Sequence, residues 1–118
     1  MPDRRRHRGA HPRDRDCFAP EALEILQRAT DDLCWLRSRG YPDKASLKLV
    51  GDRYRLRLRQ RSALQRCAVA EDAVDRRLAR LVAPASVRGK PLLIDGYNVL
   101  LTVEAALGGG VVLVARDG

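Results

Sequence analysis

Apolar residues recur at helical spacing through the first two thirds of the chain. Pro20 suits a first helical position and Gly40 a helix end, and between them one apolar stripe runs through Ala22, Ile25, Leu26, Ala29, Leu33 and Leu36. Further helices are predicted over residues 44–54, 57–67 and 71–82, with apolar positions at Leu47, Val50, Tyr54, Leu58, Ala63, Leu64, Cys67, Val74, Leu78 and Leu81. We therefore expect a helical module over residues 17–86.

One stretch of this module admits two interpretations. Residues 53–61 read R-Y-R-L-R-L-R-Q-R, and strict alternation of arginine with other residues is typical of a strand. Helical spacing continues, however, through Leu58, Ala63 and Leu64, and no second strand lies nearby to pair with the first. We therefore predict two helices joined by a short turn near Leu56, which resembles a helix-turn-helix unit.

The pattern changes at residues 91–101, which read P-L-L-I-D-G-Y-N-V-L-L. The apolar run at 92–94 predicts a short buried strand, followed by a tight turn and a helix over residues 99–107. A second strand is predicted at 111–115, so the predicted fold class is a mainly α module followed by an incomplete α/β (βαβ) unit over residues 90–118. Because the chain stops just past that strand, we expect the α/β domain to be truncated.

Asp95 is the strongest single site candidate in this second part. It lies at the carboxyl end of the predicted strand, beside the free N–H groups of the following helix, where open α/β sheets place ligands. The alternative is a turn residue that only caps the helix.

The distribution of charge along the chain indicates what kind of partner the protein binds. The net charge is +8 and the isoelectric point about 10.2, and residues 37–66 hold ten basic residues against two acidic ones, which equals the whole net charge. Such an excess points to an anionic partner, nucleic acid above all. Residues 1–16 are predicted to be a mobile basic arm because they lack apolar periodicity.

The basic block supplies the candidates for nucleic-acid binding. Side chains of these types contact phosphates and base edges: Lys44, Lys48, Arg53, Arg55, Arg57, Arg59, Gln60, Arg61 and Arg66. The alternative is a solvated arginine fringe on an ordinary helical hairpin. Trp35 falls off the apolar stripe, and it either stacks on a base or forms a second buried face or a partner contact.

Most of the chain resembles domain-of-unknown-function family 434, a group of uncharacterised bacterial and archaeal proteins. The resemblance rests on H-P-R-D at residues 11–14, L-K-L-V-G-D-R-Y-R-L at 47–56, R-Q-R at 59–61 and L-L-I-D-G-Y-N-V-L at 92–100. Arg57 departs from the pattern, because a polar capping residue is expected there. The family has no established activity, so the resemblance implies none.

A shorter motif, I-D-G-Y-N-V at residues 94–99, resembles the opening of NYN/PIN-type ribonucleases. That resemblance implies that Asp95 helps to hold Mg²⁺ or Mn²⁺ and that Asn98 supports the site. Asp117 would join them if the two predicted strands were parallel neighbours, whereas Glu104 lies too far along the helix. Metal-assisted cleavage needs several converging carboxylates, so this chain is not expected to be an enzyme by itself, although a longer form could be a metal-dependent ribonuclease.

We therefore expect an uncharacterised nucleic-acid-binding protein, with RNA favoured over DNA. The alternatives are a helix-turn-helix DNA-binding regulator and a protein-interaction module with a basic face, and a protein partner or second copy would cover the incomplete sheet. No apolar run is long enough for a membrane span. The three cysteines lack the spacing of a zinc site or a disulfide framework, which favours reduced thiols and a cytoplasmic location.

Overall fold

The computed structural model describes residues 10–118, which divide into two compact units. A helical unit comprises Arg15–Leu81 and Leu113–Gly118, and a smaller unit comprises residues 10–14 and Val82–Val112. Most of the predicted mobile arm, residues 1–9, lies outside the described residues. The end of that arm is helical, because α1 (Asp14–Cys17) begins at Asp14 and buries Cys17.

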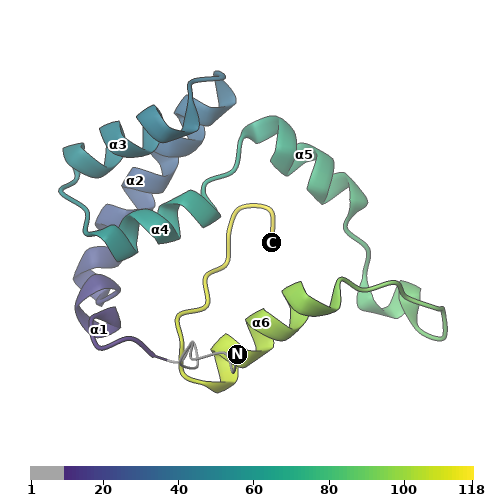
Figure 1. Cartoon of the computed structure of the whole chain (residues 1–118). Helices are drawn as coiled ribbons and strands as arrows, with labels where there is room; N and C mark the ends of the chain where they lie inside the picture. Colours follow the sequence, from purple (N-terminus) through teal and green to yellow (C-terminus); the bar gives the residue numbers. More distant parts are fainter. Residues whose placement is uncertain (1–9) are drawn as a thin grey trace, which may run out of the picture. The chain divides into compact units, whose positions relative to one another are not determined.

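Three helices enclose the core of the helical unit, and they lie side by side in Figure 1: α2 (Pro20–Ser38), α3 (Asp43–Arg53) and α4 (Leu58–Cys67). The predicted helices and the turn between the second and third are confirmed, so the alternating stretch is not a strand. The buried cluster consists of Leu26, Ala29, Leu33, Cys34, Val50, Leu56, Leu64 and Ala68. Small and branched aliphatic side chains thus form the core, as the scarcity of aromatic residues requires.

The end of α2 follows from the glycine that the sequence analysis identified. Gly40 has a φ of +79°, its N–H donates to the Arg37 carbonyl, and the Tyr41 N–H donates to the Leu36 carbonyl. This pair of hydrogen bonds is the Schellman motif, which needs a left-handed residue at that position. Glycine therefore ends the helix without strain and directs the chain into α3.

The predicted apolar face of α4 is partly wrong. Leu58 is exposed, whereas Leu56 in the preceding turn is buried, and Gln60, Leu64 and Ala68 form the buried line at intervals of four residues. Because the first buried position is polar, a search for apolar residues alone misses it. The next helix, α5 (Glu71–Arg80), agrees with prediction but buries no residue, and Leu78 on its expected apolar face is exposed.

The predicted βαβ unit is wrong. The smaller unit contains a 3₁₀ turn, η1 (Pro84–Val87), and α6 (Gly96–Leu107), and no strand or sheet occurs among residues 10–118. Leu92, Leu93 and Ile94, the expected buried strand, are exposed, and the stretch at 111–115 is extended but unpaired. The physical reason is that a strand must pair its N–H and C=O groups with a neighbour, and two short segments are too few for a stable parallel sheet.

None of the helices in the described part of the chain combines the length and apolarity that crossing a membrane requires.

Candidate nucleic-acid interface

The loop between α3 and α4, which carries the alternating arginines, is held in place by two of its residues. Tyr54 donates from its hydroxyl to Asp32 on α2 at 2.7 Å, and Leu56 is buried in the core. The residues between and beside these anchors, Arg53, Arg55 and Arg57, are exposed. We call these three residues the arginine turn. The alternation that is typical of a strand therefore occurs here in a turn. Tyr54 and Leu56 point toward the core, and the arginines beside them point to solvent.

Arg55 adopts the left-handed backbone conformation, with a φ of +52°, and is the one non-glycine residue with positive φ among residues 10–118. Its N–H donates to the Asp52 carbonyl, and the Leu56 N–H donates to the Gly51 carbonyl, so α3 ends in a Schellman motif as α2 does. Glycine occupies this position at the end of α2, and arginine occupies it at the end of α3. A side chain with a β-carbon is disfavoured in this conformation by about 1 kcal/mol or more.

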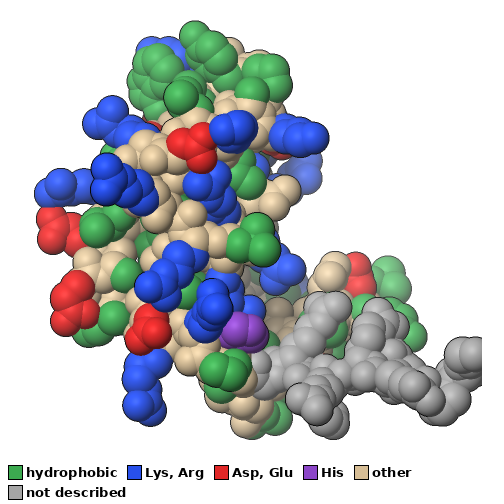
Figure 2. All heavy atoms as spheres, turned by 60° about the vertical axis from the view of Figure 1, so that its left-hand side comes forward, with side chains coloured by type: hydrophobic (Ala, Val, Ile, Leu, Met, Phe, Trp, Pro, Cys, Tyr) green, Lys and Arg blue, Asp and Glu red, His purple; other side chains and the backbone are tan. Residues whose placement is uncertain are grey.

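The arginine turn carries cations that acids do not fully neutralise. Arg53 lies 3.8 Å from Asp32, a loose ion pair with both side chains well exposed. The side chains of Arg55 and Arg57 form no ion pair with an acid in the described part of the chain. In Figure 2, Lys and Arg side chains spread over the visible face of the helical unit, with fewer acidic ones among them.

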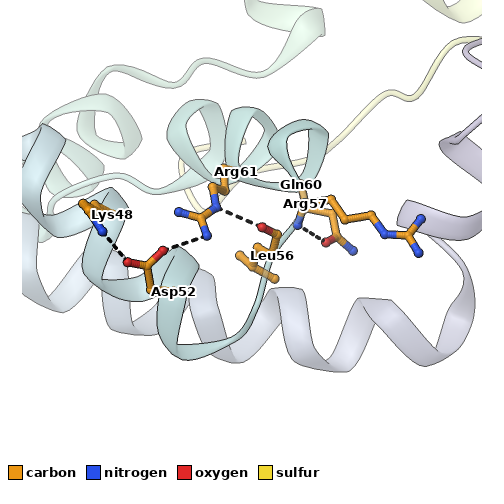
Figure 3. Close-up of polar contacts among 6 residues, drawn as sticks. All are labelled: Lys48, Asp52, Leu56, Arg57, Gln60 and Arg61. Atoms are coloured by element: carbon orange, nitrogen blue, oxygen red, sulfur yellow. Dashed lines mark hydrogen bonds and ion pairs between the residues drawn. The ribbon is translucent and has the colours of Figure 1, made fainter.

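Arg61, in contrast, is bound internally. Its Nε donates to the Leu56 carbonyl at 2.9 Å, and its Nη2 lies 2.9 Å from an Asp52 carboxylate oxygen (Figure 3). The guanidinium lies directly on Gly51, where a side chain would collide with it. Arg61 therefore clamps the turn onto α3, and its predicted role in binding an external phosphate has no support in this geometry.

Lys48 is held at the same carboxylate. Its Nζ lies 2.6 Å from Asp52, one helical turn away on α3, as its spacing of four residues predicts (Figure 3). The hydrogen bonds from Lys48 and then from Arg61 lower the pKa of Asp52 from its ordinary value of 3.8. One acid thus engages two of the predicted phosphate-binding cations.

Gln60 is also committed to the fold. Its carboxamide oxygen accepts from the Arg57 N–H at 2.9 Å, and its Nε2 donates to the Cys17 carbonyl at 2.9 Å. The first bond supplies the cap at the start of α4 that Arg57 itself cannot supply, and the second ties α1 to α4. Because Gln60 is buried and bonded at both ends of its carboxamide, its predicted contact with nucleic acid has no support in this geometry.

Arg37 belongs to the basic block but is largely covered, with 14% of its side chain accessible. Its guanidinium pairs with Asp43 at 2.9 Å and donates to the carbonyls of Gln65 and Ala68 at the end of α4. A cation at this end of a helix is favoured by the helix dipole. Arg37 therefore joins three helices, so its charge is not presented to a partner.

The remaining predicted residues lie on α3 and α4. Lys44 is exposed in the first turn of α3 and Arg66 in the last turn of α4, whereas Arg59 is half-buried. The structure therefore separates the basic block into internal clamps, at Arg37 and Arg61, and exposed cations, which lie at the arginine turn and at the far ends of α3 and α4.

The predicted metal residues are not assembled into a ligand cluster. Asn98 donates from Nδ2 to a carboxylate oxygen of Asp95 at 2.7 Å, so these two side chains at the start of α6 do meet. Asp117 belongs to the helical unit and pairs with Arg77. No group of three His, Cys, Asp or Glu side chains suited to a metal occurs among residues 10–118. The strand pairing that was expected to bring Asp117 beside Asp95 is absent from the described residues.

The sequence analysis identified Trp35 as a candidate but missed the group that it forms with Arg39 and Tyr41 at the end of α2. Trp35 lies under the Arg39 guanidinium, whose Cζ is 3.8 Å from the ring centroid, and stacks with Tyr41 at 6.5 Å between centroids. Trp35 and Arg39 are four residues apart on one helix, so the pairing of these two could have been predicted from their spacing. The position of Tyr41 depends on the Schellman turn and could not.

Comparison with known proteins finds that two parts of the chain match family models without known function. Residues 25–80 match the model described as a protein of unknown function, DUF434, and residues 84–118 match a domain of unknown function, DUF5616. An uncharacterised protein of Methanocaldococcus jannaschii is 27% identical over 92 residues, which cover 78% of this chain and 44% of that protein. The chain thus spans less than half the length of this relative. No solved structure matches the chain. These matches do not confirm the resemblance to NYN/PIN-type ribonucleases.

Proposed function

We propose from its local geometry that the helical unit, whose residues 25–80 match the DUF434 model of unknown function, binds nucleic acid through the arginine turn. The proposed contacts run from Arg53, Arg55 and Arg57 to backbone phosphates. Contacts of this kind depend on charge and position and carry no sequence information.

The backbone of Arg55 is the observation that supports the proposal most. Glycine would end α3 with less strain, yet the position holds a long cationic side chain that is exposed and has no acidic partner in the described part of the chain. Backbone strain of this kind gathers at functional sites, where the side chain serves a purpose that outweighs it. An arginine fork matches the geometry of a phosphate group.

The test measures how binding depends on salt. A labelled single-stranded RNA and a labelled DNA duplex are titrated by fluorescence anisotropy across a salt series with the whole chain. Arg55→Gly should weaken binding to both and reduce the slope of log affinity against log salt by about 0.7 to 0.9, which is one phosphate contact. The variant should retain the fold, because glycine adopts the positive φ of position 55 without strain.

Arg76→Gln is the matched control, because it removes one charge from an exposed arginine of α5 that pairs with Asp72. It should leave the slope unchanged. If the chain binds neither RNA nor DNA at about 50 mM salt, or if both variants reduce the slope equally, the arginine turn is not a phosphate-binding site.

A second candidate is a sequence-specific duplex binder. It is favoured by the connection of four residues between α3 and α4, which is the length found in helix-turn-helix units. That function requires side chains of α4 in the major groove. It predicts a large preference for one duplex sequence at constant salt, whereas the arginine turn predicts equal affinity for all sequences.

A further inference from the structure

The end of α2 presents an aromatic surface that the core does not use. Trp35 is 52% exposed and Tyr41 is 53% exposed, although aromatic residues make up only 4% of the chain. Their rings lie 20° from parallel, with centroids 6.5 Å apart. Two large rings are thus held nearly parallel and open to solvent, where burial would have stabilised the fold more.

The position of these rings is fixed by the local backbone. Trp35 lies in the last turns of α2, and Tyr41 follows Gly40, its N–H bonded to the Leu36 carbonyl at 3.1 Å. The Arg39 guanidinium lies over one face of the Trp35 ring, with Cζ 3.8 Å from the ring centroid. The arrangement is therefore built before any ligand arrives, which lowers the entropy that binding would lose.

One cation contacts the rings, a second follows closely in sequence, and the acid beside that second cation is already paired. Arg39 lies on Trp35 itself, and Lys44 is exposed three residues after Tyr41. Asp43, which lies between Tyr41 and Lys44 in sequence, pairs with Arg37 at 2.9 Å. A negatively charged chain with flat, apolar side groups matches this surface in both charge and shape.

We infer that Trp35 and Tyr41 form a stacking platform for unpaired nucleobases, with Arg39 placed to bind the flanking phosphate. This inference rests on the proposed function and adds a substrate class to it, since bases inside a duplex are already stacked and unavailable. It therefore assigns the helical unit a preference for single strands. Stacking tolerates every base, because each has a π face, so the platform does not select a sequence.

Trp35 is the only tryptophan of the chain, so its fluorescence reports on the platform directly. The whole chain is titrated with an oligouridine strand, with an abasic strand of the same length, and with a duplex, and both anisotropy and tryptophan emission are recorded. The oligouridine strand should quench the emission with the same dissociation constant that anisotropy gives. The abasic strand should bind without quenching, because it supplies phosphates and no bases.

Substitution separates stacking from charge. Trp35→Ala should weaken binding of the oligouridine strand about fivefold or more and leave the salt slope unchanged. Trp35→Phe should retain most of the affinity. The control is Ile25→Ala, which truncates an apolar side chain of similar exposure, 46%, on the same helix and should change affinity less than twofold, which is about 0.4 kcal/mol.

The outcomes distinguish this inference from the function on which it rests. If no strand changes the anisotropy, the proposed function itself is wrong. If the abasic strand binds as tightly as the oligouridine strand and Trp35→Ala retains full affinity, the phosphate-binding function stands and the stacking platform is excluded. Equal affinity for duplex and single strand in the presence of quenching would overturn the stated preference.

Discussion

The guanidinium of Arg61 lies against the α-carbon of Gly51, so that a β-carbon at position 51 would stand 2.6 Å from Cζ of Arg61. This contact explains a glycine in the interior of a helix, where it costs about 1 kcal/mol relative to alanine. The absence of a side chain lets Arg61 reach across α3 to both Asp52 and the Leu56 carbonyl. The two positions therefore depend on each other.

Gly51→Ala should have opposite effects in two backgrounds. In the Arg61→Ala background it should stabilise the fold by about 1 kcal/mol, because alanine is the better helix former and nothing obstructs it. With Arg61 present it displaces the guanidinium and loses hydrogen bonds to a charged group, which costs about 1 to 3 kcal/mol. Urea unfolding of the four variants measures the coupling energy. Additivity within about 0.5 kcal/mol would contradict the contact.

Arg55→Gly should raise the free energy of unfolding by about 0.5 to 1 kcal/mol while it weakens nucleic-acid binding. The gain comes from relief of a left-handed backbone that disfavours a β-carbon, less the entropy that glycine loses on folding. Arg57→Gly is the matched control, since Arg57 has a φ of −70° and gains nothing from glycine. Thermal unfolding compares the two. A loss of stability in Arg55→Gly would show that the side chain itself supports the turn.

Gln60→Leu should destabilise the helical unit by about 1 to 3 kcal/mol. Leucine keeps the volume of the side chain but leaves the Arg57 N–H and the Cys17 carbonyl without their partners. Exchange of the Arg57 amide hydrogen should accelerate as well, which NMR can follow residue by residue. Gln65→Leu, at an exposed position of the same helix, should be nearly neutral. If the two variants change the free energy of unfolding equally, the hydrogen bonds of Gln60 do not stabilise the fold.

The carboxyl group of Asp52 should titrate below its ordinary value of 3.8 in the folded chain, because Lys48 first and Arg61 second donate to its charged form. A depressed pKa stabilises the folded state above the unfolded pKa, and this stabilisation disappears as the pH falls through the folded pKa. Lys48→Gln should move the pKa of Asp52 back toward 3.8, as carbon-13 NMR would record. An unchanged midpoint in that variant would place the cause elsewhere.

The helices were predictable because their signals are local. Pro20 and Gly40 bound α2 in the sequence and in the structure, and a spacing of four residues sufficed to pair Lys48 with Asp52. The strands predicted at 92–94 and 111–115 do not form, and apolar runs alone could not reveal this, because pairing is a property of two segments and neither one reveals the other.

The site shows the same division between local and distant contacts. The run of arginines at 53–61 supplied candidates for nucleic-acid binding, and those at positions 53, 55 and 57 are exposed. It could not reveal that Arg61 and Arg37 turn inward, because their partners at Leu56, Gln65 and Ala68 are backbone carbonyls, which carry no signature in the sequence. Gln60 was misjudged for a related reason, since a polar residue in the buried line of α4 looks like a surface residue.

The order of the helices has a consequence for how the chain acquires its structure. Helices α2, α3 and α4 follow one another in sequence, and each connection is four residues long. Short loops lose little entropy on closing, and proteins dominated by such neighbouring contacts fold within microseconds to milliseconds. Ribosomal synthesis adds only about 5 to 20 residues each second. The three-helix core should therefore be complete on the ribosome while the later residues are still being added.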